Sequence, residues 1–342
     1  MDRVVFVTQQ VDPAHPTLGA ATGMIRALAS RVEAVDVLAL RAVDGVLPAN
    51  CRVHVFGAPR RFERTTRFAA ALLRTLSPRP RAVIAHMSPV YAVLAAPVCR
   101  PLRVPVVLWF THWRASPMLR LGVRAATAVA TAERTSFPLR SPKVMAIGHG
   151  IDVGELPCRQ APGATSPLRL LALGRTSAIK GLETAIAGTR IARARGVEAE
   201  LEIRGASETP AEEAYRRTLD QLAGDGVRVE PPIPRTELGE LFARTDLLVN
   251  ATISGSLDKA VLEATASCVP AVASSPAFAD LLPAELRFEP SDAGELADRI
   301  AAFAALDAGA RRALAEELRR RVVARHSTST WAERILALAD GR

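Results

Sequence analysis

The chain has 342 residues, more than one hydrophobic core usually supports, so about two domains of roughly 150 residues each are expected. Its composition, 49% hydrophobic and 23% charged, is that of an ordinary soluble globular protein. The four cysteines are widely separated and form no paired metal-ligand spacing, which predicts a reduced, cytosolic chain without structural zinc.

The positive charge of the chain is concentrated in its first half. The net charge is +9, but residues 1–160 have 21 Lys and Arg against 9 Asp and Glu, whereas the remainder has 23 against 26. Aromatic residues make up only 4%, and no RNP-type aromatic strand, zinc finger or helix-turn-helix pattern occurs. Nucleic acid is therefore not the expected partner.

Taken in chain order, short apolar runs rich in β-branched residues alternate with helical patterns. The first half has "VVFVT", "VDVLAL", "RVHVFG", "AVIAHM", "PVVLWF" and "VMAIG", and the second has "LRLLALG", "AELEIRG", "VRVEPPI", "LLVNAT", "AVAS" and "LRFEP". This alternation predicts an α/β chain with two doubly wound parallel sheets. We expect a first domain over residues 1–155, a linker over 156–167, a second domain over 168–325, and a last helix over 326–342 that crosses back to the first domain.

No segment of the sequence is typical of a signal peptide or a membrane-spanning helix. The N-terminus begins as a strand, and the apolar stretch 83–99 contains a histidine and a proline and is too short to span a bilayer. Residues 60–81 combine seven arginines and one acid with Phe62, Phe68, Leu72, Leu73 and Leu76. They form either a basic amphipathic surface on anionic lipid or an ordinary solvated helix. We expect a cytoplasmic protein, peripheral on the inner face of the membrane in the first case.

The stretch "LLALGRTSAIKGLETAIAG", residues 170–188, joins a strand that ends at Gly174 to a helix that begins at Gly181. Loops at the carboxyl ends of parallel strands carry ligand sites, and a helix N-terminus favours phosphate. This loop adds a guanidinium from Arg175 and an ammonium from Lys180. Neither G-x-G-x-x-G nor G-x-x-x-x-G-K-[ST] occurs, so two solvated loop charges are the alternative to an anion site.

Lysine is rare in this chain. Only Lys143, Lys180 and Lys259 occur among the 44 basic residues, and the last two open helices at strand ends in the second half. This pattern indicates an ammonium that a bulkier guanidinium could not replace. Lys259 lies in a second strand-to-helix segment, "NATISGSLDKAVLEATASCVPAVAS", and Glu263 follows it on the same predicted helix.

Several of these motifs together resemble a known family. The segments "GRTSAIKG", "LEIRGA", "PPIPRTELGELFARTDLLVNAT" and "LDKAVLEATASCVPAV" are similar, in order and spacing, to the donor domain of retaining glycosyltransferases of family 4. The resemblance covers most of residues 168–274. It implies a GT-B fold, in which two Rossmann-like domains with parallel sheets face an interdomain cleft. It also implies transfer of a sugar from a nucleotide-diphosphate sugar to an acceptor hydroxyl, with retention of configuration and with no metal or other cofactor.

The resemblance also implies roles for residues of the second domain. Arg175 and Lys180 would hold the diphosphate and act in catalysis, Glu263 would bind ribose hydroxyls, and backbone near Ile233 would meet the nucleobase. The alternative for Glu263 is a surface carboxylate paired with Lys259. The remaining donor-binding candidates lie in the strand-to-helix loops and are Gly205, Gly255, Ser256, Leu257, Asp258 and Lys259.

The first half resembles the family more weakly. In "HPTLGAATGMIRALA", Gly19 and Ala20 match the loop and first helix that face the acceptor, and His112 in "VVLWFTHW" matches a strand-end histidine near the transferred sugar. The segment "IGHGID" resembles G-N-G-I-D, with His149 in place of the asparagine. The alternatives are a loop histidine with ordinary partners for His112 and a glycine that permits a turn for Gly19.

One departure from the family pattern bears on activity. The paired glutamates of the family are eight positions apart, and Gly255 stands eight positions before Glu263, so the first carboxylate is missing and Asp258 is the candidate replacement. A sugar-nucleotide epimerase of the same fold and a non-catalytic sugar-nucleotide-binding protein therefore remain as alternatives. The acceptor, whether a small molecule, a lipid-linked molecule or a polysaccharide, is not specified by the sequence.

Overall fold

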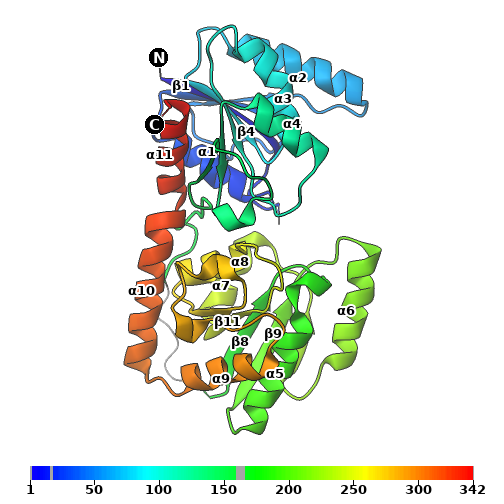
Figure 1. Cartoon of the computed structure of the whole chain (residues 1–342), viewed down its shortest axis with the longest axis vertical. Helices are drawn as coiled ribbons and strands as arrows, with labels where there is room; N and C mark the ends of the chain where they lie inside the picture. Colours follow the sequence, from blue (N-terminus) through cyan, green and yellow to red (C-terminus); the bar gives the residue numbers. More distant parts are fainter. Residues whose placement is uncertain (1, 16–17, 159–165, 342) are drawn as a thin grey trace. The chain divides into compact units, whose positions relative to one another are not determined.

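The computed structural model describes residues 2–15, 18–158 and 166–341 (Figure 1). The linker expected over 156–167 includes residues 159–165, which lie outside the described residues. The chain divides into two compact units. Unit 1 comprises Met1–Asp152 with Arg325–Arg342, and unit 2 comprises Val153–Ala324.

Unit 1 is built on a seven-stranded sheet with the order β3-β2-β1-β4-β5-β6-β7, in which every neighbouring pair is parallel. Side chains along β4 and β5 are buried on both faces, as expected of a parallel sheet that helices cover on each side. The strands are β1 (Arg3–Val11), β2 (Ala34–Ala42), β3 (Cys51–Val55), β4 (Ala82–His86), β5 (Val106–Trp109), β6 (Ala128–Thr131) and β7 (Val144–Ala146).

The helices of unit 1 come from both ends of the chain. They are α1 (Ala20–Ala29), α2 (Arg61–Thr75), α3 (Pro89–Cys99), α4 (Pro117–Ala125) and α11 (Thr328–Ala339). The C-terminal helix α11 contributes Trp331, which is fully buried and makes edge contacts with Phe6 of β1 and Trp109 of β5. The last residues of the chain therefore complete the core of unit 1.

Unit 2 is built on a five-stranded parallel sheet with the order β10-β9-β8-β11-β12. Its strands are β8 (Leu168–Leu173), β9 (Ala199–Arg204), β10 (Val227–Glu230), β11 (Leu247–Asn250) and β12 (Ala271–Ala273). Its helices are α5 (Leu182–Ala194), α6 (Pro210–Leu222), α7 (Leu238–Ala243), α8 (Lys259–Ala266) and α9 (Ala293–Ala304), and α10 (Ala308–His326) contains the boundary with unit 1.

The expected fold class, an α/β chain with two doubly wound parallel sheets, is confirmed. Two element predictions were wrong. The strand β6 was missed because "AVAT" is short and rich in alanine, which has low β-propensity. The run "LRFEP" forms no strand among the described residues and makes only an isolated bridge from Arg287 to Ala273.

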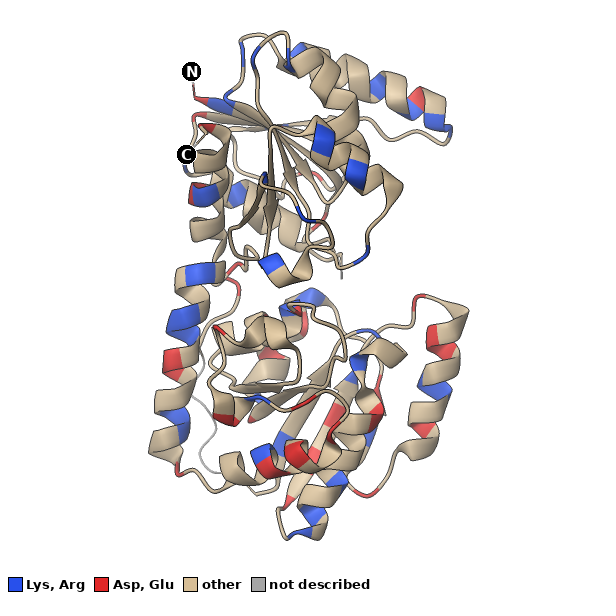
Figure 2. Cartoon of the chain, viewed as in Figure 1, with Lys and Arg blue, Asp and Glu red and all other residues tan. Residues whose placement is uncertain are grey.

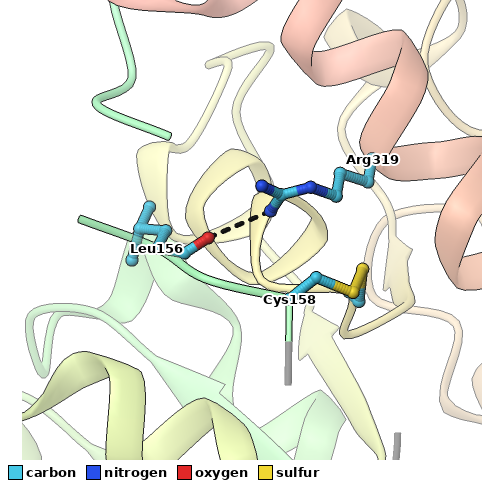
Figure 3. The surroundings of a disulfide bond; sticks show 4 residues. Leu156, Cys158 and Arg319 are labelled. Atoms are coloured by element: carbon cyan, nitrogen blue, oxygen red, sulfur yellow. Dashed lines mark hydrogen bonds between the residues drawn. A yellow bond between two sulfur atoms is a disulfide. The ribbon is translucent and has the colours of Figure 1, made fainter. Parts of the chain in front are cut away.

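The expectation that all cysteines are reduced is wrong for one pair. Cys158 and Cys268 form a disulfide within unit 2, although they are 110 positions apart in the sequence (Figure 3). The spacing argument failed because the fold brings the segment before β8 to the residue that follows α8. Arg319 of α10 donates a hydrogen bond to the carbonyl oxygen of Leu156 in the same segment (Figure 3). Cys51 and Cys99 are free thiols.

The amphipathic pattern of residues 60–81 has a structural explanation. Phe68, Leu72 and Leu76 are buried in the core of unit 1. Most of the apolar residues that could have contacted lipid therefore pack inside the protein. Only Phe62 and Leu73 of the five apolar residues stay exposed. Basic residues recur along the outside of α2 (Figure 2). None of the helices in the described ranges is both long and apolar enough to cross a membrane.

Candidate functional site

The strand order of unit 2 defines where a ligand site is expected. The chain leaves β8 toward β9 on one side and later returns to β11 on the other side of β8, so the order reverses between β8 and β11. In open parallel sheets, ligands bind outside the carboxyl ends of the strands at such a reversal. The loops that follow β8 and β11, residues 174–181 and 251–258, begin at this point.

These two loops are held together by backbone contacts. The amide of Ile253 donates to the carbonyl oxygen of Ile179 at 3.0 Å. Gly181 has φ +57, and a Cβ there would overlap the carbonyl oxygen of Ala251. Gly205, after β9, approaches the loop from the other side, because a Cβ there would overlap the carbonyl oxygen of Gly174. Glycine at positions 181 and 205 therefore lets the loops that follow β8, β9 and β11 approach one another closely.

The first loop ends in a helix N-terminus without a side-chain cap. A 3₁₀ turn, Ala178–Lys180, leads to Gly181, which is the N-cap of α5. The helix was predicted to begin at Gly181 and begins one residue later, at Leu182. Glycine has no side chain to accept from the first-turn amides, and the structure has no side-chain cap there. Free amides and the partial positive charge of a helix N-terminus favour an anion such as phosphate.

Lys180 crosses from the first loop to the second. Its Nζ lies 2.7 Å from Oδ1 of Asp258, and both side chains are mostly buried, with exposed fractions of 19% and 12%. Ser256 donates to the same Oδ1, while Asn250 and Thr252 donate to Oδ2. Burial alone would raise the pKa of Asp258, but the charge of Lys180 and these hydrogen bonds outweigh burial and lower the pKa below its usual value. Asp258 is therefore a carboxylate at neutral pH.

Arg175 pairs with carboxylates that follow β9, the neighbour of β8 on the other side from β11. Its Nη1 lies 3.2 Å from Oε2 of Glu208 and 3.2 Å from Oε1 of Glu212, and 49% of its side chain is exposed. Both acids belong to the segment that follows β9, whereas the partner of Lys180 follows β11. The two predicted diphosphate cations thus have separate carboxylate partners, and neither is a plain solvated loop charge.

Glu263 lies on α8 and is buried, with Oε1 2.5 Å from Nη1 of Arg235. Arg235 belongs to the segment after β10 that contains Ile233, the predicted nucleobase contact, which is half-buried. The alternative of a surface carboxylate paired with Lys259 is wrong, because Glu263 is inside and its ion-pair partner is Arg235. Sequence reasoning missed Arg235, although it stands within the quoted motif "PPIPRTEL".

Lys259 is the first residue of α8, and Glu263 is one turn further along the helix. Within the described residues, the Lys259 ammonium makes no hydrogen bond and no ion pair. Burial lowers its pKa, as does the charge of Arg235, while Glu263 opposes that shift. A bound anion would stabilise the charged form of such a buried ammonium.

The other predicted donor contacts of the second loop have different surroundings. Gly255 is exposed, and a Cβ there would meet nothing within 4 Å. Ser256 is half-buried and bonds to Ser254 and Asp258 through its hydroxyl, and Leu257 is buried. The structure therefore has open space where the first family carboxylate is missing.

The third lysine has an identifiable structural role in unit 1. Lys143 donates to the carbonyl oxygens of Val123, Arg124 and Ala126 at the C-terminus of α4. A cation at a helix C-terminus satisfies orphan carbonyls and complements the helix dipole. Lys143 thus differs from the two lysines at the edge of the five-stranded sheet.

The sheet of unit 1 reverses its order between β1 and β4. There Oγ1 of Thr8 lies 3.0 Å from Nδ1 of His86, and Gln9 donates to Oγ of Ser88. His86 stacks on Phe6 and is buried. Sequence reasoning treated "AVIAHM" only as a strand, although a histidine at the carboxyl end of a central strand was the available signal.

The predicted acceptor-side residues lie on the same edge of unit 1. Gly19 is the N-cap of α1, and Ala20 is its first residue. A Cβ at Gly19 would lie 2.7 Å from the carbonyl oxygens of Pro13 and His15, so glycine is needed for close approach and not for a left-handed turn. Residues 16 and 17 of this loop lie outside the described residues. His112 is exposed after β5, accepts from the amide of Arg114 and stacks beside Trp113.

His149 is buried in unit 1 next to another histidine. Its amide donates to Nδ1 of His326, and its ring makes an edge contact with Trp109. Burial, with the charges of Arg325 and Arg334, lowers the pKa of His326 to about 4. No group of three or more His, Cys, Asp or Glu side chains within the described ranges could hold a metal ion.

The chain matches one protein family over more than half of its length. Residues 121–338 match the model of a family described as family 4 glycosyltransferase in conflict systems. The matched region includes all of unit 2 and therefore both loops that flank the order reversal. No curated protein sequence matches the chain.

Solved structures show the same fold over the whole chain. A glycosyltransferase from Rickettsia africae has a TM-score of 0.77 at 11% identity, covering 99% of this chain and 98% of that one. Sucrose-phosphate synthase from Thermosynechococcus elongatus has a TM-score of 0.73 at 19% identity, covering 100% and 99%. HepE from Anabaena, in complex with UDP and glucose, has a TM-score of 0.74 at 16% identity and covers 100% of both chains.

Proposed function

Since the chain belongs to the family 4 glycosyltransferases in conflict systems, we propose that it moves a sugar from a nucleotide-diphosphate sugar to an acceptor hydroxyl with retention of configuration. The observation that carries the proposal is the edge of the five-stranded sheet between β8 and β11. There the ammonium of Lys180 and the uncapped N-terminus of α5 follow β8, and Lys259 begins the helix that follows the second loop of the same order reversal.

The proposed reaction forms two bonds and breaks two, one pair at the anomeric carbon and one pair in the transfer of a proton. The acceptor oxygen bonds to the anomeric carbon on the face that the diphosphate leaves, and the glycosyl–phosphate bond breaks with its electron pair going to the diphosphate. The acceptor proton ends on a phosphate oxygen. Preorganised cations at a leaving group that gains negative charge stabilise the transition state more than the ground state.

The chain's own groups supply that positive charge in our proposal. Lys180 and the first-turn amides of α5 contact the leaving phosphates, and Arg175 shares its five donors between Glu208, Glu212 and the same diphosphate. We propose that no metal ion is required. Full turnover after dialysis against EDTA is the expected result, and loss of turnover that Mg²⁺ restores would contradict it.

We propose that unit 2 binds the donor and that Glu263 binds its ribose. The buried Glu263–Arg235 pair supports this role, because Arg235 fixes one carboxylate oxygen and leaves the other to accept from hydroxyls. A uridine diphosphate sugar is the first donor to test, since the Anabaena structure that covers this whole chain contains UDP and glucose.

We propose further that unit 1 takes the acceptor at the loop of Gly19 and Ala20, and that His112 on the same edge of the sheet lies near the transferred sugar and acts in catalysis. The polar pairs Thr8–His86 and Gln9–Ser88 at the order reversal of the same sheet support this location. Contact with a membrane is supported by the charge of α2, because most of its apolar residues are buried in unit 1. The arginines that stay exposed on and around α2 are Arg60, Arg61, Arg67, Arg74 and Arg79, with Phe62 beside them.

We propose that this arginine face contacts anionic lipid electrostatically. Flotation with phosphatidylserine vesicles should show binding in low salt that disappears at high salt, because exposed charges are screened there. Arg61→Glu with Arg74→Glu should abolish flotation. Failure of the wild-type protein to float at low salt would reject the contact and leave α2 a solvated helix.

The decisive experiment is a donor panel with product analysis. UDP-, GDP- and ADP-sugars are titrated by calorimetry, and the donor that binds is incubated with cell extract for mass spectrometry. A glycosylated product is the expected result, and its anomeric configuration by NMR tests retention. Conversion of the donor without an acceptor product would indicate an epimerase. Binding without turnover in any extract would indicate a non-catalytic sugar-nucleotide-binding protein.

A further inference from the structure

Asp258 has an unusual position for an aspartate at a helix start. It is the N-cap of α8, with φ −68° and ψ 129°, where an aspartate normally accepts from an amide of the first turn. Here the side chain makes no cap hydrogen bond. The carboxylate is turned away from its own helix and toward the loop that carries Lys180.

Two buried neutral donors fix this orientation. Asn250 and Thr252, exposed by only 6% and 1%, donate to Oδ2 of Asp258 from the end of β11. Buried donors of this kind are costly to leave without an acceptor. The carboxylate is therefore anchored to β11 independently of Lys180, and its second oxygen, Oδ1, receives the ammonium at 2.7 Å together with the hydroxyl of Ser256.

The ion pair changes what a diphosphate meets at this loop. An ammonium has three donors, so Lys180 can keep Asp258 and still donate to phosphate oxygens. The positive charge of Lys180, which attracts the phosphate, is nevertheless partly offset by the Asp258 carboxylate that is hydrogen-bonded to it. Lys259, in contrast, has no such carboxylate bonded to it among the described residues.

We propose that Asp258 is a positioning residue that weakens the hold of Lys180 on the nucleoside diphosphate and so speeds its release after transfer. This inference rests on the proposed function, in which Lys180 contacts the leaving diphosphate. Release of product limits turnover in many enzymes. A carboxylate beside Lys180 therefore lowers the affinity for the diphosphate and shortens the time for which it stays bound. Asp258 sets that balance through Lys180.

The test measures the affinity of the nucleoside diphosphate that binds best among UDP, GDP and ADP, and of its nucleoside, by calorimetry. Asp258→Asn should bind the diphosphate about tenfold more tightly, because one opposing unit charge near 3 Å has been removed, with no change for the nucleoside. Steady-state KM for the donor and kcat should both fall. A purely structural role would instead lower the melting temperature and weaken both ligands.

The double mutant separates this inference from the proposed function. Lys180→Ala should weaken binding of the diphosphate, and Asp258→Asn in the Lys180→Ala background should strengthen it by clearly less than tenfold, because Asp258 acts mainly through Lys180. If Lys180→Ala leaves the affinity unchanged, the proposed clamp fails and the inference with it. If Lys180→Ala weakens binding but Asp258→Asn does not strengthen it, only the role of Asp258 is overturned.

Two variants guard against a folding artefact. Asp246→Asn is the matched control, because Asp246 is also buried in unit 2 and paired with Arg169, but it precedes β11 at the opposite end of the strand. Its diphosphate affinity should equal that of the wild type. If Asp258→Asn does not fold, Asp258→Ser removes the same charge with a residue that suits an N-cap, and it should show the same tighter binding.

Discussion

The two sheet edges of this protein have the same topology and different chemistry. In unit 1 the order reversal between β1 and β4 is bridged by hydrogen bonds between polar side chains, Thr8 with His86 and Gln9 with Ser88. In unit 2 the reversal between β8 and β11 is bridged by the Lys180–Asp258 ion pair beside an uncapped helix N-terminus. A shared scaffold thus has polar hydrogen bonds at one edge and an ion pair at the other, although the arginine excess lies in the first half of the chain.

The largest expected effect tests whether the charged edge alone acts on the diphosphate. Lys180→Ala should lower turnover by on the order of 10²–10³, about 3–4 kcal/mol of transition-state stabilisation. Lys143→Ala is the matched lysine control and should leave turnover unchanged, since Lys143 caps α4 in unit 1. Wild-type turnover in Lys180→Ala would remove the functional distinction between the two edges.

The disulfide Cys158–Cys268 lies in unit 2, so its removal should destabilise unit 2 and not unit 1. Cys158→Ser should lower the free energy of unfolding of unit 2 by roughly 2–4 kcal/mol, because the disulfide closes a long loop of the unfolded chain. All three tryptophans lie in unit 1, so circular dichroism should report an early transition that tryptophan fluorescence does not follow. Cys51→Ser is the control, and equal melting of both variants would contradict the assignment.

Acid should weaken unit 1 through His326. Its folded pKa of about 4 lies below the ordinary value of 6.5, so the unfolded chain binds the proton more readily, and stability is complete above about pH 6.5 and lost as the pH falls toward 4. Between pH 7.5 and pH 5 the loss should be about 2 kcal/mol. Urea unfolding followed by tryptophan fluorescence measures it. His326→Asn keeps an acceptor for the amide of His149 and should flatten this slope, and an unchanged slope would exclude His326 as its source.

Lys259, whose ammonium has no ion pair among the described residues, provides a smaller test. Lys259→Ala should weaken binding of the donor by roughly 1–3 kcal/mol, the range for a lost hydrogen bond to a charged group, with little change in melting temperature. Calorimetric titration with UDP and with the UDP-sugar shows whether the contact is to phosphate or to sugar. Identical affinities in mutant and wild type would return Lys259 to a structural role.

The smallest effect concerns the missing carboxylate. A side chain at position 255 has open space, so Gly255→Glu should fold normally and raise turnover with a hexose donor by about tenfold. Gly239→Glu is the control, because position 239 in α7 also has nothing within 4 Å of an added Cβ. Lower turnover in Gly255→Glu alone would mean that the edge works without a second carboxylate.

The sequence specified the fold class and the two loops of unit 2, because strands, helix starts and loop residues are local patterns. It could not specify the partners of the charges. Lys180 and Asp258 are 78 positions apart, and Arg235 and Glu263 are 28 apart, so only the folded sheet brings them together. The disulfide and the Thr8–His86 contact were missed for the same reason. The assigned roles of Arg175, His112 and the other site residues stay predictions.

The division of unit 1 between the two ends of the chain has a consequence for biosynthesis. Its core includes Trp331 against Phe6 and Trp109, and its segment around Ile151 pairs with Ser327, so unit 1 lacks these contacts until α11 has left the ribosome. Unit 2 is continuous and ends at Ala324. The order of maturation is thus reversed relative to the order of translation, and a nascent chain stalled before α11 exposes an unfinished first unit to chaperones and proteases.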